Sequence, residues 1–178
     1  FESRESIPGH FTGNDNALFI VANPYVTAVN PGTKVLKDDL SASSHSTSGY
    51  VNMGFAHLND RAKYRAIRVK GYLGENDYCP RLQITVGAAN PNKLPSKING
   101  QAFTDQTEAN WKSLIKTDDW NVFVYDLIDC GFGISNFENT TTVQFRPLSK
   151  FNGNNIDEGA ASETNTRIVY YDDIEFLE

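Results

Sequence analysis

The chain reads RLQITV over residues 81–86, an alternation of polar and apolar side chains that is typical of a half-buried β-strand. Successive side chains of a strand point to opposite faces, so Leu82 and Ile84 are predicted to face inward, and Arg81 and Gln83 outward. Residues 64–72 and 140–147 repeat this period of two. Two sheets packed through their apolar faces follow from the pattern.

Short stretches of this kind recur along the 178 residues, separated by loops rich in Gly, Pro, Asn and Ser. We predict strands over residues 17–22, 33–37, 49–58, 64–72, 81–88, 121–127, 140–147 and 167–177. Two longer segments are predicted to be loops, 90–119 with a short helix over 107–115, and 149–166. The predicted fold is all-β, a two-sheet jelly-roll β-sandwich that forms a single domain over residues 1–178.

The formal net charge is -6, and the Lys and Arg residues are scattered along the chain. This argues against a nucleic-acid partner, which calls for a clustered basic face. No apolar run is long enough to predict membrane insertion. Because the chain opens on Phe1 rather than Met, we expect a secreted or cell-surface protein, or an excised module. Cys79 and Cys130 either pair in an oxidising compartment or remain buried thiols.

Nothing in the sequence predicts catalysis. Glycoside hydrolysis needs two placed carboxylates, and the acids here occur as adjacent pairs in loops or at strand ends. No Ser, His and Asp set forms a nucleophile elbow, and no Cys and His spacing suits zinc. We therefore expect a protein that is not an enzyme.

Four short motifs carry a family resemblance: FES at 1–3, NPGTKVLK at 30–37, DWNVFVYD at 119–126 and VYYDDIEF at 169–176. Their order resembles the calcium-binding jelly-roll carbohydrate-binding modules of families four and twenty-two. It is most similar to versions from the surface and secreted glycan-degrading systems of Bacteroidetes. The chain departs from that group at a strand that often carries a sugar-stacking Trp, where the nearest aromatic residue is Tyr50.

The resemblance implies a structural Ca²⁺ that ties the first strand to the last. Calcium prefers carboxylate and carbonyl oxygens, which makes Glu2, Asp172 and Asp173 the candidate side-chain ligands. Backbone carbonyls between Asn30 and Lys34 are expected to complete the shell. If Ile174 and Phe176 face inward, alternation places Asp172 on their side and Asp173 on the other, which favours Asp172.

A glycan site needs aromatic rings for the apolar faces of sugars, and amide or charged side chains for the hydroxyl groups. The candidate residues are Tyr50, Asn52, Arg68, Tyr72, Gln83, Trp111, Gln144 and Arg146. Trp111 has an alternative role, in which it fixes the short helix to a sheet, and Trp120 is assigned to the core.

We therefore predict a module that binds a plant or algal polysaccharide, of the β-glucan, xylan or mannan type. The module would target an attached glycan-degrading enzyme to that polysaccharide. The alternative is a structural or adhesin β-sandwich with no glycan affinity.

Overall fold

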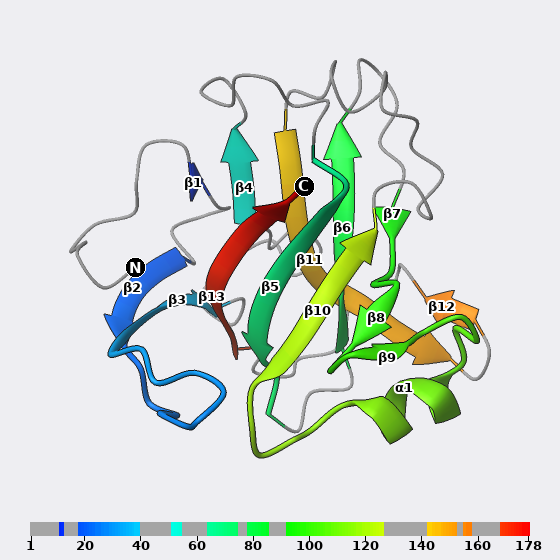
Figure 1. The fold of residues 1–178 in the computed structure, drawn as a ribbon, viewed down its shortest axis with the longest axis horizontal. Coiled ribbons are helices and arrows are strands. Elements are labelled where there is room, and N and C mark those ends of the chain that lie inside the picture. The colour runs from blue at the N-terminus through cyan, green and yellow to red at the C-terminus, as the bar shows by residue number, and fades with distance from the viewer. Residues whose placement is uncertain are drawn as a thin grey trace.

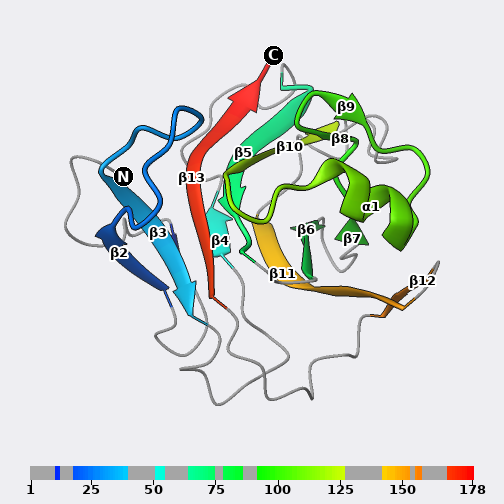
Figure 2. The ribbon, with the colours of Figure 1, turned by 90° about the horizontal axis from the view of Figure 1, so that it is seen from below.

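The computed structural model describes the backbone of residues 11–12, 18–39, 51–54, 64–74, 78–85, 92–126, 142–152, 155–157 and 168–178. Side chains are described for residues 19–39, 64–74, 94–126 and 168–178. Within these ranges two antiparallel sheets form two layers (Figures 1 and 2). No helix of the described part is long and apolar enough to cross a membrane.

The first layer is a seven-stranded sheet with the order β2-β3-β13-β5-β10-β8-β9. Its strands are β2 (Leu18–Ala22), β3 (Lys34–Asp39), β13 (Ile168–Leu177), β5 (Ala66–Tyr72), β10 (Asn121–Asp126), β8 (Lys97–Ile98) and β9 (Gln101–Ala102). Strand β3 lies between β2 and β13, so the predicted strand over residues 17–22 is not a neighbour of the last strand. Residues 1–10, which include Glu2, lie outside the described residues.

The second layer is a six-stranded sheet with the order β1-β4-β11-β6-β7, in which β12 also pairs with β11. Its strands are β1 (Phe11–Thr12), β4 (Val51–Gly54), β11 (Thr142–Asn152), β6 (Tyr78–Thr85), β7 (Asn92–Lys93) and β12 (Asn155–Asp157). Each of the eight predicted strands overlaps a strand of one of the two sheets. The predicted all-β sandwich is therefore confirmed.

The core lies on the inner face of the seven-stranded sheet, the face turned toward the other layer. Alternation along β5 buries Ile67 and Val69 completely and leaves Arg68 exposed, as the sequence predicted. Gly71 lies in the same sheet, and a Cβ there would lie 3.0 Å from Cε2 of Phe123, so the ring occupies the place of a side chain. Other fully buried members of this face are Leu36, Tyr125, Val169 and Tyr171.

The segment 90–119 contains more regular structure than the predicted loop. Strands β8 and β9 form a hairpin through Asn99 and Gly100, which both have positive φ, at 51° and 83°. An Asn-Gly pair favours this two-residue turn because both residues tolerate the left-handed region. Helix α1 (Glu108–Leu114) follows, and the Thr107 hydroxyl caps it by accepting a hydrogen bond from Asn110 N at 3.3 Å. The predicted helix is confirmed.

Two irregularities interrupt the strand pairing. Strand β11 shifts register against β6 between Arg146 and Ser149, around Pro147, which has no N–H to donate. Beyond this point β11 continues to Asn152, five residues past the predicted end of the strand. Strand β13 shifts register against β5 between Asp172 and Glu175, and Asp173 has a φ of 44°. Each irregularity has the form of a β-bulge.

Candidate functional site

A row of four residues crosses the outer face of the seven-stranded sheet. The strand register pairs Phe19 with Lys37, Lys37 with Tyr170, and Tyr170 with Tyr72. Directly opposed residues share a face, so these side chains lie on one surface. Phe19 is 43% exposed, and the other three are partly exposed. The row places two tyrosines, one phenylalanine and one lysine side by side.

Tyr25 lies over one end of this row. Its ring is parallel to that of Tyr72, with 3.7 Å between ring centroids and 6° between planes. Its edge-to-face contact with Tyr170 has a centroid distance of 5.5 Å. Tyr72 also meets Trp120, which is fully buried as expected for a core residue, at 5.9 Å. Such aromatic pairs add about 0.5–1.5 kcal/mol each beyond the area that they bury.

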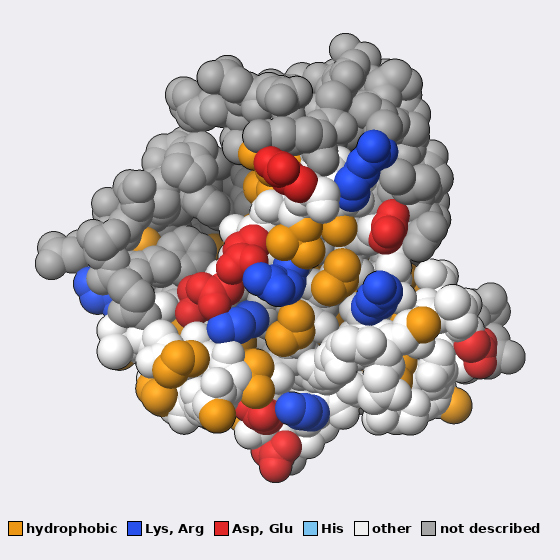
Figure 3. Space-filling view, in the orientation of Figure 1, with side chains coloured by type: hydrophobic (Ala, Val, Ile, Leu, Met, Phe, Trp, Pro, Cys, Tyr) orange, Lys and Arg blue, Asp and Glu red, His pale blue; other side chains and the backbone are white. Residues whose placement is uncertain are grey.

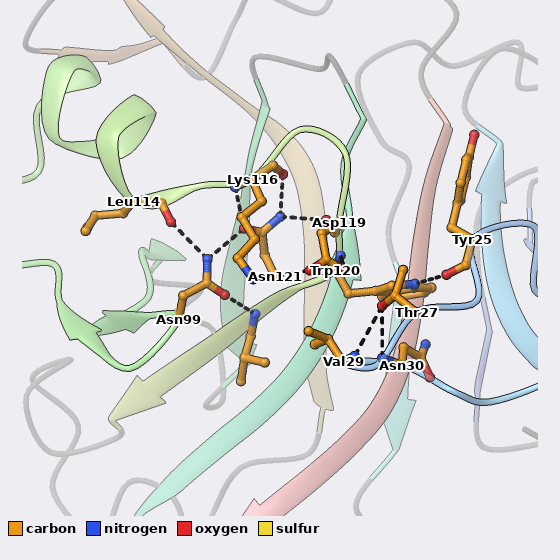
Figure 4. A network of polar contacts seen from close by, with 11 residues as sticks. Tyr25, Thr27, Val29, Asn30, Asn99, Leu114, Lys116, Asp119, Trp120 and Asn121 are labelled. Atoms are coloured by element: carbon orange, nitrogen blue, oxygen red, sulfur yellow. Dashed lines mark hydrogen bonds and ion pairs between the residues drawn. The ribbon is translucent and has the colours of Figure 1, made fainter.

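The loop that carries Tyr25 is held by its own polar side chains. Asn23 Oδ1 accepts a hydrogen bond from Tyr25 N at 2.9 Å, and Asn23 Nδ2 donates to Gly32 O at 2.8 Å. Thr27 Oγ1 accepts from the amides of Val29 and Asn30 at 3.2 and 3.3 Å. These bonds close the loop onto itself, and Figure 4 shows the two that Thr27 accepts.

Trp120 fastens this loop to the segment before β10. Its Nε1 donates to the carbonyl oxygen of Tyr25 at 2.7 Å. Asp119 also contacts this loop, through a hydrogen bond with the side chain of Thr27. Burial acts to raise the pKa of its carboxyl, but hydrogen bonds from Thr27 and from Trp120 N, together with Lys116, lower the pKa below its usual value. Figure 4 shows the 116–121 segment beside the loop.

The phenol hydroxyl groups of Tyr72 and Tyr170 keep their protons at neutral pH. Burial raises the pKa of Tyr72 and of Tyr170, and the nearby Tyr25 adds to the rise at both residues. A protonated phenol both donates and accepts a hydrogen bond. The cluster therefore offers ring surface and hydrogen-bonding groups together.

Paired charges occupy the rest of this outer face. Lys37 contacts Asp39 at 2.6 Å and Lys70 contacts Asp173 at 2.6 Å, while Arg68 pairs with Glu175. In Figure 3 charged side chains gather across the middle of the face, and apolar side chains lie over the loop below them. Arg68, predicted to contact sugar, is thus engaged with a carboxylate of the neighbouring strand.

The six-stranded sheet presents a different row. Asn52 pairs with Gln144 and Gln144 with Gln83, and the edge strands add Thr12 opposite Asn52 and Asn92 opposite Gln83. We call these five residues the amide row. The register also aligns a neighbouring row, which is apolar in sequence and consists of Phe11, Met53, Val143 and Ile84.

The structure divides the predicted sugar-binding residues between the two sheets. Asn52, Gln83, Gln144 and Arg146 belong to the six-stranded sheet, where Arg146 pairs with Arg81. Arg68 and Tyr72 belong to the seven-stranded sheet, so they cannot lie in one row with the others. Tyr50 lies outside the described residues.

Trp111 faces the core instead of the solvent. It is 1% exposed and packs against Phe103 and Phe123 at centroid distances of 6.0 and 5.9 Å. A ring with so little exposed surface has no face on which a sugar could stack. The predicted sugar contact of Trp111 is therefore wrong in this structure, and its alternative role, fixing the helix to the sheet, is what the packing shows.

The predicted calcium residues are partly brought together. Asp172 is 4% exposed, and burial raises the pKa of its carboxyl, against which the adjacent Asn30 side chain acts. Asp173 instead turns outward to Lys70. Lys34 begins β3 next to this loop, and only its carbonyl oxygen suits a cation. Among the described residues no group of three acidic, His or Cys side chains forms a metal cluster.

The sequence predicted Asp172 on the same face of the last strand as Phe176, and the structure places it on the other face. Asp172 pairs with Lys70, an outward residue, whereas Phe176 pairs with the buried Ile67. The bulge at Asp173 adds one residue and shifts the alternation, so Asp172 and Phe176 lie on opposite faces. Asp172 is nevertheless buried, beside Asn30 of the loop that carries Tyr25.

Three aromatic residues on the outer face of the seven-stranded sheet were not among the predicted sugar-binding residues: Phe19, Tyr25 and Tyr170. Alternation with the buried Tyr171 could have placed Tyr170 outward, and the same reasoning applies to Phe19 beside Ile20. Tyr25 lies in a loop, where no periodic signal exists. Its contact with Tyr72, 47 positions away in the sequence, arises only from the fold.

One further acid is buried on the inner face. Asp38 is fully buried, and neither oxygen of its side chain has a hydrogen-bond donor among the described residues. Burial, with a smaller contribution from Asp39, raises the pKa of Asp38 to about 7. Its complete burial leaves no path for a substrate to touch it in this conformation.

The two layers and their faces define a two-sheet antiparallel β-sandwich. Its fold is similar to that of the CBM22-2 xylan-binding domain of Xyn10C from Paenibacillus barcinonensis, with a TM-score of 0.56 and 13% sequence identity. The similarity covers 95% of this chain and 91% of that domain. No protein-family model and no curated protein matches the sequence. At this identity the likeness establishes the fold alone.

Proposed function

We propose that the protein is a non-catalytic module that binds a plant or algal polysaccharide of the xylan, β-glucan or mannan type through the amide row. The observation that carries the proposal is the register that aligns Asn52, Gln144 and Gln83 across three adjacent strands. Support comes from the likeness in fold to a xylan-binding domain. The module would be secreted or displayed at the cell surface, attached to a glycan-degrading enzyme.

The chemistry of the amide row suits an extended glycan. Each Asn or Gln side chain both donates and accepts hydrogen bonds, as sugar hydroxyls do. The row from Thr12 to Asn92 crosses five strands, a span of about 19 Å at the usual strand spacing. The sequence predicts that Val143 and Ile84 face the other sheet, and on this prediction the amide row faces solvent.

The test is affinity electrophoresis through gels that contain xylan, β-glucan or mannan. We expect retardation by at least one glycan, and we expect Gln83→Ala and Gln144→Ala to weaken it by about tenfold, the loss typical of removing a central contact residue. Gln101→Ala is the matched control, because Gln101 is an exposed glutamine of the other sheet. Unretarded migration on every glycan would contradict the proposal, and release of reducing sugar would show an enzyme instead.

We also propose a structural Ca²⁺ held by Asp172, the Asn30 region and Glu2. The buried Asp172 carboxyl and the carbonyl groups of the adjacent loop are the oxygen donors that Ca²⁺ prefers. A bound cation would favour the charged form of Asp172 and stabilise the contact between loop and strand.

Thermal melting with and without EDTA tests the calcium proposal. We expect the midpoint to fall with EDTA and to recover with excess Ca²⁺, because a ligand of the folded state alone stabilises that state. Asp172→Asn should abolish the response, and Asp173→Asn, whose carboxylate pairs with Lys70, should retain it. If EDTA leaves the melting midpoint of the wild-type protein unchanged, the calcium proposal is wrong.

One observation favours a second function, that of a structural or adhesin domain without glycan affinity. Arg68 is held by Glu175, and Trp111 is buried, so two of the predicted sugar contacts have structural roles. The electrophoresis experiment decides between the two functions, because this domain would pass every glycan gel unretarded.

A further inference from the structure

We propose that the outer face of the seven-stranded sheet carries a second saccharide-binding surface, on the opposite side of the molecule from the amide row. We call it the aromatic patch, and it consists of Phe19, Tyr25, Val26, Tyr72 and Tyr170. The proposal takes its ligand class from the proposed function, and it adds a site made of different residues on a different sheet.

The distribution of exposed apolar residues points to this surface. Among residues with described side chains, the exposed large hydrophobic ones are Phe19, Tyr25 and Val26, at 43%, 38% and 61% exposure. Isolated exposed apolar residues are ordinary, but here all three fall within an eight-residue stretch beside one row of the sheet. Figure 3 shows apolar side chains gathered over this loop, beside the charged band.

The Tyr25 loop and the strand that carries Phe19 are both held in place by contacts within the protein. Tyr25 is stacked on Tyr72, its amide is bonded to Asn23, and its carbonyl is bonded to the indole of Trp120. Phe19 projects from a strand that is paired over its whole length with β3. Side chains that are already ordered, as those of Tyr25 and Tyr72 are, lose little conformational entropy on binding, which favours a ligand that makes weak contacts, such as a sugar.

The chemistry of the patch fits a saccharide. The exposed rings of Phe19 and Tyr25 suit the C–H faces of sugars, and the protonated hydroxyls of Tyr72 and Tyr170 can bond to sugar hydroxyls. Phe19 and Tyr170 lie two strands apart, about 10 Å at the usual spacing, so an oligosaccharide rather than a single sugar spans them.

The size of the patch argues against a protein partner. A stable protein interface buries about 800 Å² on each side and engages roughly 20–30 residues. The patch has five residues, and Lys37, which is paired with Asp39, lies between Phe19 and Tyr170. The charges of this pair and of the Lys70–Asp173 pair on the same face already satisfy one another. An oligosaccharide needs only a few rings and a polar border, which this surface supplies.

Two saccharide surfaces on opposite sheets give the module a property that one surface lacks. They cannot share a short oligosaccharide, but they can hold two segments of long polysaccharide chains. When both engage one matrix, the second contact forms at high effective concentration, and avidity rises without new contacts.

The test is a titration of isotope-labelled protein with xylo-, cello- and manno-oligosaccharides, followed by NMR. We expect shifts at Phe19, Tyr25 and Tyr170, and we expect Phe19→Ala and Tyr25→Ala each to weaken this binding by about tenfold. The variants come from different elements, so disruption of the loop in one leaves the other informative. Val124→Ala, on another strand of the same sheet, is the matched control, and melting curves check each fold.

The outcomes separate this inference from the proposed function. Shifts confined to the amide row, with Phe19→Ala and Tyr25→Ala binding as wild type, would overturn the aromatic patch and leave the proposed function intact. Shifts at the patch that persist in Gln144→Ala would support the patch even if the amide row shows none. If no oligosaccharide shifts any residue of either surface, both proposals fail.

Discussion

The two faces of the seven-stranded sheet treat the same residue types in opposite ways. Asp39 on the outer face contacts Lys37 and keeps some solvent, while Asp38, its neighbour in sequence, is fully buried without a hydrogen-bond donor among the described residues. Tyr170 lies outward among exposed rings, and Tyr171 is buried. The face, more than the residue type, decides whether a side chain serves stability or is available for binding.

The largest effect is expected from Trp111, on the inner side of this comparison. Trp111→Ala removes a buried ring that packs against Phe103 and Phe123, and should lower the free energy of unfolding by about 3–5 kcal/mol. Urea unfolding measures this loss, and Trp111→Phe should recover part of it. If Trp111→Ala keeps its stability but no longer binds glycan, Trp111 contacts the ligand and its structural role is wrong.

Asp38 should make stability depend on pH. The folded state keeps the Asp38 proton up to a pKa of about 7, whereas the unfolded chain releases it near 3.8. The folded state therefore binds more protons in this window, and stability falls as pH rises from about 4 to 7, by roughly 1.4 kcal/mol per pH unit at most.

Asp38→Asn tests this dependence directly. We expect the variant to melt higher than wild type at pH 8 and to show a flatter profile between pH 4 and 7. Asp39→Asn is the comparison on the opposite face. It should keep most of the fall in stability and move its upper end to lower pH, because the Asp39 charge makes the smaller contribution to the raised pKa of Asp38. Parallel profiles for wild type and Asp38→Asn would show that the buried acid does not control the slope.

The smallest effect is expected on the outer face, at the Arg68–Glu175 pair. Both side chains are nearly half exposed, at 45% and 43%, so Arg68→Ala should change stability by less than about 1 kcal/mol. The change should shrink further in high salt, because exposed charges are screened. Unfolding at two salt concentrations measures it, and a loss comparable to that of Trp111→Ala would contradict the division between the faces.

The sequence predicted the strands well because the main ones bury one face, and burial leaves a period of two. It did not predict β1, β7, β8, β9 and β12, since strands of two or three residues have no measurable period. The Asn99–Gly100 pair was the available signal for the hairpin of β8 and β9. The extension of β11 was missed because the bulge after Arg146 ends the alternation.

The candidate site was less predictable for a specific physical reason. Alternation tells which face of a strand a residue occupies, but it does not tell to which sheet the strand belongs. Arg68 and Gln144 were therefore grouped although they lie in different sheets. The stack of Tyr25 on Tyr72 depends on a loop conformation set by Asn23 and Trp120, which no local pattern encodes.

The bulge at Asp173 has a further consequence for how the last strand tolerates change. Beyond the bulge, Glu175 faces outward to Arg68 while Phe176 faces the core opposite Ile67. Deletion of Asp173 would bring β13 back into step with β5 and keep Glu175 outward and Phe176 inward, because Asp172 and Glu175 already lie on the same face. Replacements at position 173 should be limited to residues such as Gly or Asn, because its φ of 44° disfavours most other side chains, whereas loss of this residue should leave the faces of the strand unchanged.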